Sequence, residues 1–238
     1  MYPDLDALSR AAAEALVGLI ETTLAARDRF ALALAGGGTP RHLYQLLAGP
    51  YRERIPWDRL YLFWGDERYV PYDHPESNYR TAHEAFIRHL PIPPGHVFPI
   101  PTQATSPEAA AEAYASTLNQ FFAGGGPAFD LALLGLGADG HTASLFAENA
   151  PHTAQEQDGA ARWVEAVIAP SRYPTRPRIT LTLPALNQAR HVFFLVSGAA
   201  KRETVQTLLD QADPSLPAAH VQAREHLTWF VDQAAYAK

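Results

Sequence analysis

Apolar and polar residues follow two recurring patterns along the chain, one helical and one extended. From residue 5 to residue 27, apolar side chains return at helical spacing and predict an amphipathic helix. A short apolar run at residues 30–35 then predicts a buried strand. It ends in three glycines, followed by Thr39 as the predicted N-cap and Pro40 as the first residue of a second helix.

The same succession of apolar run, turn and helical stretch continues through the rest of the chain. Further strands are predicted at residues 60–64, 129–134, 163–168, 179–183, 192–196 and 228–231, and further helices at 78–89, 106–122, 142–146 and 199–210. Such alternation is typical of a largely parallel sheet covered by helices on both faces. No repeat or linker divides the sequence, so we expect a single domain over residues 1–238.

Composition narrows the classes of function. The 238 residues are 47% hydrophobic and 18% charged, which is ordinary for a globular protein, and the net charge of −6 argues against binding to nucleic acid or acidic membranes. The absence of cysteine excludes disulfides, thiolate catalysis and Cys-based metal sites. No signal-peptide pattern and no apolar run of membrane-spanning length is found, so a cytoplasmic location is expected.

Four predicted strand ends carry residues that could bind or act on a ligand. Ligands of open α/β sheets bind in the crevice at the carboxyl ends of strands. At the first of these ends, Gly37 and Gly38 let the backbone approach a ligand, and the helix that follows Thr39 attracts an anion at its N-terminus. The P-loop pattern is missing, and a tight turn that packs a helix on the sheet would explain the glycines equally well.

The second strand end carries Asp66, Glu67 and Arg68 directly after an apolar run. Three charges at such a place are costly unless they are paired or exposed in a cleft. A solvated loop with a local ion pair is one explanation. In a binding site, Arg68 would hold an oxyanion or phosphate, and Asp66 would orient a sugar hydroxyl or a neighbouring histidine.

The third strand end is the segment GLGADGHTAS at residues 135–144, which formally matches the G-x-G-x-x-G dinucleotide fingerprint. We disfavour that interpretation because the motif lies past the middle of the chain and Asp139 would place negative charge beside a pyrophosphate. His141 is the stronger feature, since a neutral imidazole there can act as a general base near pH 7. Gly137 and Gly140 then form the turn that presents it.

Arg178 and Lys201 are the fourth candidates. Lys201 follows a glycine turn at the end of a predicted strand, and only Lys201 and Lys238 are lysines. A solvated helical lysine is the simpler explanation until the other strand ends are considered. No metal site is predicted, because His83 and His89 are spaced to lie on different helix faces, unlike the histidines of H-E-x-x-H.

Several segments together resemble one family. They are LALAGGGTPRHLYQLL, FWGDERYVP with HPESNYR, LLGLGADGHTASLF, and ITLTLPALN with FLVSGAAKRETV, and they are similar to the signature blocks of 6-phosphogluconolactonases. The glycine block is shared with glucosamine-6-phosphate deaminases, which typically carry D-E-Y in place of D-E-R and an N-E-P segment after the G-H pair. Arg68 and the TAS segment at residues 142–144 favour the lactonases. The AENA segment at residues 147–150 departs from the Pro-Gly turn that lactonases often have.

The resemblance implies a three-layer α/β/α fold with a mostly parallel twisted sheet, as in glucosamine-6-phosphate deaminase and ribose-5-phosphate isomerase. It also implies hydrolysis of 6-phospho-D-glucono-1,5-lactone to 6-phospho-D-gluconate, the second step of the oxidative pentose phosphate pathway. That reaction needs an activated water, a donor to the oxyanion and a grip on a phosphate, and we expect neither cofactor nor metal.

These needs can be assigned to residues. His141 would be the general base, and Asp66 would orient either His141 or the substrate. Amides near Gly37–Gly38 or Gly137–Gly140 would serve the oxyanion, while Arg68 and Lys201 would hold the phosphate. The expected substrate-binding set is Gly37, Gly38, Thr39, Arg68, Gly137, Asp139, Gly140, Arg178 and Lys201.

The expected partner is a small phosphorylated sugar lactone, bound by a monomer or weak homodimer. Three alternatives remain open: an amino-sugar-phosphate deaminase or isomerase on the same fold, a non-catalytic sugar-phosphate sensor, and, more distantly, a nucleotide-dependent oxidoreductase.

Overall fold

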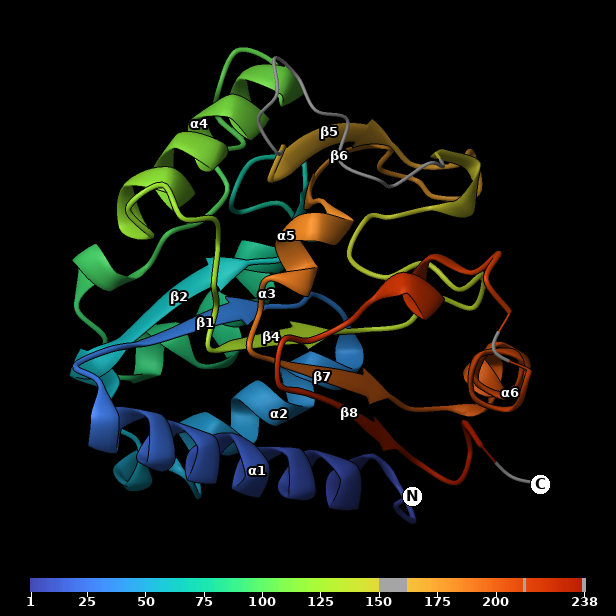
Figure 1. The fold of residues 1–238 in the computed structure, drawn as a ribbon, viewed down its shortest axis with the longest axis horizontal. Helices are drawn as coiled ribbons and strands as arrows, with labels where there is room; N and C mark the ends of the chain where they lie inside the picture. Colours follow the sequence, from blue (N-terminus) through green and yellow to red (C-terminus); the bar gives the residue numbers. More distant parts are fainter. Residues whose placement is uncertain (150–161, 212, 237–238) are drawn as a thin grey trace.

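A parallel sheet of five strands runs through the middle of the molecule (Figure 1). The computed structural model describes residues 1–149, 162–211 and 213–236. In spatial order the strands are β2 (Leu60–Trp64), β1 (Phe30–Leu34), β4 (Leu131–Leu134), β7 (His191–Val196) and β8 (His226–Val231). Every neighbouring pair is parallel, which confirms the predicted sheet. The strand order reverses between β1 and β4, and such a switch point opens a crevice at the carboxyl ends of the strands.

Helices cover the sheet on both sides. On one face lie α1 (Leu5–Ala26) and α2 (Gly38–Ala48), and on the other lie α4 (Pro107–Phe121) and the short α5 (Leu183–Asn187) (Figure 1). The remaining helices are α3 (Asn78–Ala85), which packs against α2, and α6 (Arg202–Asp210). This arrangement confirms the predicted three layers. Among the helices of the described residues, none has the length and apolarity needed to cross a bilayer.

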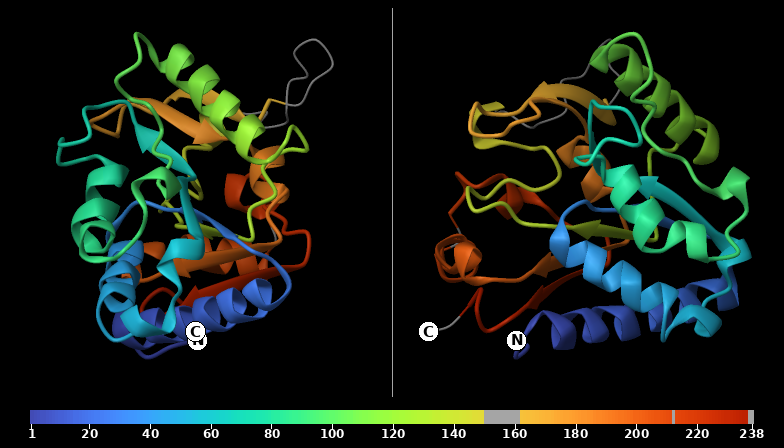
Figure 2. Two further views of the ribbon diagram at one scale, coloured as in Figure 1. Left: turned by 90° about the vertical axis from the view of Figure 1, so that its left-hand side faces the viewer. Right: turned by 180° about the vertical axis from the view of Figure 1, so that it is seen from behind.

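A second, antiparallel sheet lies above the parallel one and beneath α4 (Figure 2). Its strands are β3 (Asp66–Arg68), β6 (Pro177–Leu181) and β5 (Val164–Ile168), in that spatial order. The pattern placed residues 66–68 in a loop and gave no sign that the strands near 164 and 177 leave the parallel sheet. Gly65 explains the change, because its N–H bonds to Leu34 of β1 (2.9 Å) while its carbonyl accepts from Leu181 of β6 (2.8 Å).

Two other local predictions were wrong. The N-cap of α2 is Gly37, not Thr39, and Gly37 has a φ of +99° that other residues rarely adopt. The helix predicted at residues 142–146 is instead a tight turn in which Thr142 pairs with Leu145, and only a 3₁₀ turn follows, at Ala147–Asn149. A helix cannot form there because Ala143 has a left-handed backbone, with φ +47°.

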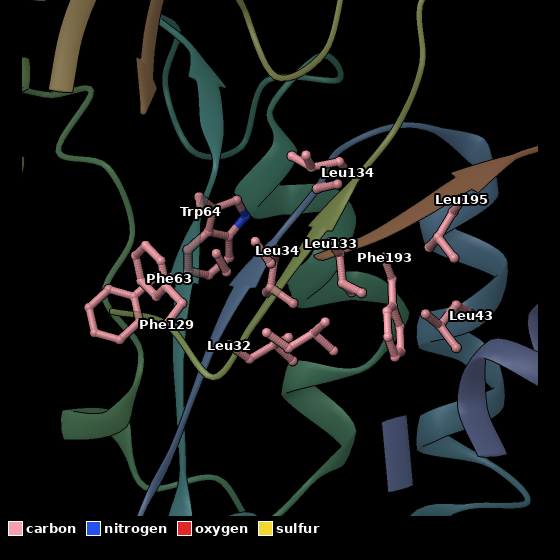
Figure 3. Close-up of a cluster of buried hydrophobic side chains, with 14 of the residues drawn as sticks. Leu32, Leu34, Leu43, Phe63, Trp64, Phe129, Leu133, Leu134, Phe193 and Leu195 are labelled. Carbon is pink, nitrogen blue, oxygen red and sulfur yellow. The ribbon is translucent and has the colours of Figure 1, made fainter. Parts of the chain in front are cut away.

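The apolar core fixes where the strands end. Figure 3 shows side chains of β1, β2, β4 and β7 gathered in one cluster with Leu43 of α2. Two fully buried tyrosines then secure the strand ends: the Tyr44 hydroxyl bonds to both backbone groups of Ala35, and the Tyr114 hydroxyl to both of Trp64. Backbone groups at a buried strand end need such partners, so the rim of the crevice is held by the core.

Candidate active site

A cleft opens at the carboxyl ends of β1, β2 and β4, with a cavity volume of about 270 Å³. Its side-chain lining combines titratable and polar groups from separate strand ends: Asp66, Arg68, Asn78, His141, Tyr173, Arg178 and Lys201. Backbone of Gly36, Gly37 and Gly137 completes the wall. The structure therefore brings together residues from all four predicted strand ends.

Four of the predicted residues lie just outside this lining. Gly38 and Thr39 belong to the first turn of α2, next to the lining residue Gly37. Asp139 and Gly140 belong to the turn that carries His141, and Asp139 contacts the cleft lining through His141 and Tyr173.

His141 is held by a carboxylate two residues away. Its Nδ1 lies 2.5 Å from Oδ1 of Asp139, whose Oδ2 accepts hydrogen bonds from Arg172 Nε (3.1 Å) and the Tyr173 hydroxyl (3.0 Å). Burial alone would raise the pKa of Asp139, but the hydrogen bonds from His141 and Arg172 outweigh it and hold that pKa well below its usual range. An ionised carboxylate only accepts, so Nδ1 carries the proton and Nε2 is the basic nitrogen of the ring.

The glycine turn explains why the histidine can sit there. A Cβ at Gly137 would overlap Nδ1 of His141, so only glycine lets the imidazole fold back over the turn. The amides of Gly137 and Gly140 are used inside the turn, donating to His141 O (2.8 Å) and Gly137 O (3.2 Å). Thr142 closes it by donating its hydroxyl to Gly135 O at 2.9 Å. The G-x-G-x-x-G segment thus forms a turn that supports the His141 side chain. The amides of Gly137 and Gly140 are hydrogen-bonded within that turn.

Asp66 makes contacts other than those expected for a partner of His141. Its carboxylate accepts from the Ser144 hydroxyl (2.6 Å) and from Asn78 Nδ2 (3.1 Å). No hydrogen bond joins Asp66 to His141 within the described part of the chain, so the orienting contact is made by Asp139. Asn78 in turn accepts from Nη1 of Arg68 at 2.8 Å. Asp66 is therefore linked to the arginine end of the cleft.

Glu67 supports this network from beneath. Its buried carboxylate accepts from the amides of Asn78 (2.7 Å) and Tyr79 (2.8 Å) and from the Ser77 hydroxyl (3.1 Å), at the N-terminus of α3. Burial raises the pKa of Glu67 to about 7, although these hydrogen bonds oppose the rise. Glu67 fixes the start of α3 and with it the position of Asn78.

Three cations line the cleft: Arg68, Arg178 and Lys201. Arg68 of β3 lies directly opposite Arg178 of β6, an arrangement in which like charges repel. Arg178 is only 5% exposed and donates its Nε to Thr175 O, while Nε of Arg68 is buried without a partner. Burial lowers the pKa of Arg178, with repulsion from Arg68 added, and burial also lowers the pKa of Lys201. Among the described residues, none of these three cations has an ion-pair partner within 4 Å.

Sequence patterns missed three residues of the site. Arg172 and Tyr173 lie in the connection between β5 and β6, where no periodicity or turn motif marks them. Asn78 falls in the HPESNYR block, but only tertiary contacts reveal its link to Asp66 and Arg68. In the part of the chain that the structure describes, no group of three or more His, Asp or Glu side chains is arranged to hold a metal ion. The expectation that no cofactor or metal is needed stays a prediction.

Comparison with known proteins agrees with this geometry. Residues 3–229 match the family described as glucosamine-6-phosphate isomerases/6-phosphogluconolactonase. The chain is 43% identical over 221 residues to the 6-phosphogluconolactonase of Synechocystis sp., covering 91% of this chain and 87% of that protein. It is 40% identical over 245 residues to that of Mycobacterium tuberculosis, covering 100% and 96%.

Solved structures give the same result. The 6-phosphogluconolactonase of Trypanosoma brucei superimposes with a TM-score of 0.83 at 32% identity, covering 99% of this chain and 95% of that one. The Thermotoga maritima enzyme gives 0.78 at 33%, covering 94% of both. A monomeric glucosamine-6-phosphate deaminase, at 20% identity and a TM-score of 0.80, shares the fold.

Fold, cleft and relatives together define an α/β enzyme. The chain belongs to the glucosamine-6-phosphate isomerase/6-phosphogluconolactonase family, and the relatives above 30% identity described here are 6-phosphogluconolactonases. The resemblance seen in the sequence is confirmed.

Proposed function

We propose that this chain hydrolyses 6-phospho-D-glucono-1,5-lactone to 6-phospho-D-gluconate, with His141 as the general base. One observation supports this more than any other: a single cleft brings together an oriented histidine and three cations that have no ion-pair partner among the described residues. A phosphorylated lactone carries the two groups that such a cleft would recognise, an electrophilic carbonyl and a dianion.

In this mechanism Nε2 of His141 takes a proton from a water molecule while the oxygen of that water attacks C1 of the lactone. The tetrahedral intermediate then collapses, the bond between C1 and the ring oxygen breaks, and the imidazolium returns the proton to that oxygen. The new carboxylic acid ionises in water. Asp139 keeps the proton on Nδ1 throughout and stabilises the imidazolium that forms in between.

The oxyanion of that intermediate needs hydrogen-bond donors. Of the two sets of amides considered from the sequence, those of Gly137 and Gly140 are occupied within their own turn. The amides of Gly37 and Gly38 precede the first bonded turn of α2 and have no backbone partner among the described residues. We assign the oxyanion to this helix start, where the helix dipole adds to the effect and each donor contributes about 3 kcal/mol.

The phosphate is assigned to Arg68, Arg178 and Lys201. A dianion between the two arginines would offset their mutual repulsion and supply an acceptor to Arg68, whose Nε is buried without a partner. Asp66, through Asn78, keeps Arg68 in place and belongs to the substrate side of the site. Thr39, in the first turn of α2, is assigned a supporting contact to the substrate.

The wider setting is also part of the proposal. Residues 1–238 act as one domain in the cytoplasm, as a monomer or weak homodimer, with neither nucleic acid nor cofactor nor metal as a partner. The net charge of −6 and the absence of cysteine support this setting.

The test is an assay with lactone generated in situ by a glucose-6-phosphate-oxidising dehydrogenase, because the lactone also hydrolyses spontaneously. We expect the protein to accelerate its disappearance well above that background. Ammonia release from glucosamine 6-phosphate would instead support the deaminase alternative, and binding of sugar phosphates without turnover would support a sensor.

A further inference from the structure

A second carboxylate approaches the His141–Asp139 pair from the 3₁₀ turn at Ala147–Asn149, in the part of the sequence that departs from the usual lactonase pattern. Glu148 accepts a hydrogen bond from Nη1 of Arg172 at 2.6 Å. The same guanidinium donates its Nε and Nη2 to Oδ2 of Asp139. Arg172 therefore bridges two carboxylates, and only one of them touches the histidine.

The proposed reaction does not itself require this bridge. His141 already has its partner in Oδ1 of Asp139, and the Tyr173 hydroxyl also bonds to Oδ2 (3.0 Å) and lies 3.1 Å from Nδ1. Arg172 is not part of the cleft lining, but it lies over the ring of the lining residue Tyr173 at 5.2 Å. It can act on the reaction through Asp139, which it binds directly, and through Tyr173.

Two consequences follow from the position of Arg172. A fork of two N–H groups on one carboxylate oxygen restrains the rotation of Asp139, so Oδ1 stays aligned with the imidazole. The guanidinium charge also opposes the carboxylate charge that stabilises an imidazolium. Because Asp139 is only one-quarter exposed, solvent screens this opposition less than it would at an open surface.

Other charged groups face the pair and must be considered with it. Lys201 acts on Asp139 from the end of β7, and Arg178 stacks over the Tyr173 ring at 5.9 Å. Both are cations of the proposed phosphate site. Glu148 is the second anion bound by Arg172, and it offsets part of the guanidinium charge that acts on Asp139.

We propose that Arg172 is a positioning residue for this reaction: it aligns Asp139 with His141 and offsets part of the Asp139 charge, and Glu148 limits that effect. This inference rests on the proposed function only for its kinetic readout. It gives the departure at residues 147–150 a role in adjusting the base.

The inference makes two predictions of opposite sign. In Arg172→Gln, the acid limb of the pH profile of kcat/KM moves to higher pH by about half a unit, because the imidazolium loses an opposing charge. In Glu148→Gln, the limb moves to lower pH by about 0.2 unit, because Arg172 then acts on Asp139 alone. Both displacements become smaller when the salt concentration is raised from 0.02 M to 0.5 M.

Arg172→Lys retains the positive charge but loses the paired N–H groups that hold Asp139. The acid limb of its pH profile therefore stays near that of the wild type, while kcat falls.

The chain offers a matched control. Glu14 of α1 and Arg54 of the 3₁₀ turn at Arg52–Arg54 form an ion pair outside the cleft lining. The side chains of Arg54 and Glu14 are 44% and 55% exposed, against 45% and 51% for Arg172 and Glu148. Arg54→Gln and Glu14→Gln leave the acid limb in place. A purely structural role for Arg172 would lower activity or stability without moving the limb in opposite directions.

An NMR pH titration of the His141 ring, assigned by comparison with His141→Gln, tests the same inference without any substrate. We expect the midpoint to move to higher pH in Arg172→Gln and to lower pH in Glu148→Gln.

Unchanged midpoints, or midpoints that move in the same direction, would overturn the inference and leave the lactonase proposal standing. Absence of lactone hydrolysis by the wild type, together with opposite NMR shifts, would overturn the proposed function and leave the inference standing. If Arg172→Gln does not fold, Glu148→Gln and Arg172→Lys carry the test.

Discussion

The two ends of the cleft satisfy their polar groups in opposite ways. At one end, His141 and Asp139 are bonded to each other, to Tyr173 and to Arg172, so that each partner fixes the next. At the other end, Arg68 and Arg178 face each other, and within the described residues neither has an ion-pair partner within 4 Å. A base works in one orientation and needs its partners within the protein. A binding group must keep donors that the protein does not use.

The largest expected effect comes from removing the base itself. His141→Gln should lower kcat by roughly 10²–10⁴-fold and change KM by no more than about threefold, because the phosphate end is untouched. Steady-state kinetics on freshly generated lactone measures both constants. His83→Gln, a histidine outside the cleft lining, is the control. A variant that keeps near-wild-type kcat would refute the role of His141.

A methyl group added to the turn that supports His141 should lower activity by displacing the imidazole. In Gly137→Ala, the new Cβ overlaps Nδ1 of His141 and Oδ1 of Asp139, so the imidazole must leave its position. We expect kcat to fall by roughly 10–100-fold, with a loss of about 1–3 kcal/mol in the free energy of unfolding from overpacking. Gly95→Ala, which adds its Cβ in open space, should change neither. Equal kinetics for the two variants would contradict the proposed support.

At the opposite end, the change should appear in binding and not in chemistry. Arg178→Gln should raise KM about tenfold and leave kcat within a few-fold, because a phosphate contact is lost. Since it also removes one of two facing like charges, the melting temperature should stay the same or rise. Arg176→Gln, in the adjoining loop, is the control for kinetics. A loss of stability with unchanged KM would mean that Arg178 serves the fold.

The smallest effect on activity is expected beneath the cleft, at Glu67, and it concerns stability. Its pKa of about 7 in the folded state exceeds the ordinary value of 4.5, so the folded protein holds the proton more tightly than the unfolded chain. The stability linked to that proton is fully present below about pH 4.5 and is lost as pH rises to about 7, by at most about 3 kcal/mol. Urea unfolding should therefore show the wild type losing stability relative to Glu67→Gln across this window. Parallel pH curves for the two proteins would contradict the shifted pKa.

Much of this protein follows from local sequence. Periodicity and apolar runs predicted the five parallel strands and the long helices, because those elements depend on which face of a short segment meets the core. Motifs at strand ends also indicated His141, Arg68, Arg178 and Lys201 as residues of one cleft, and the structure lines a cleft with all four. These residues could be identified from local sequence because the carboxyl ends of parallel strands all lie at one edge of the sheet, whatever the packing around them.

The pairing of those residues depended on contacts between distant segments. Sequence alone could not tell that Asp139, and not Asp66, holds His141, since both carboxylates follow apolar strands and only backbone geometry selects between them. Nor could it place Arg178 opposite Arg68, because that register belongs to a second sheet that begins where Gly65 bonds to β1 and β6. The sequence by itself determined the five parallel strands, the long helices and the reactive residue types. The tertiary structure decided which charges are paired and which are left for a ligand, because hydrogen-bond partners far apart in the chain are chosen only when the sheets assemble.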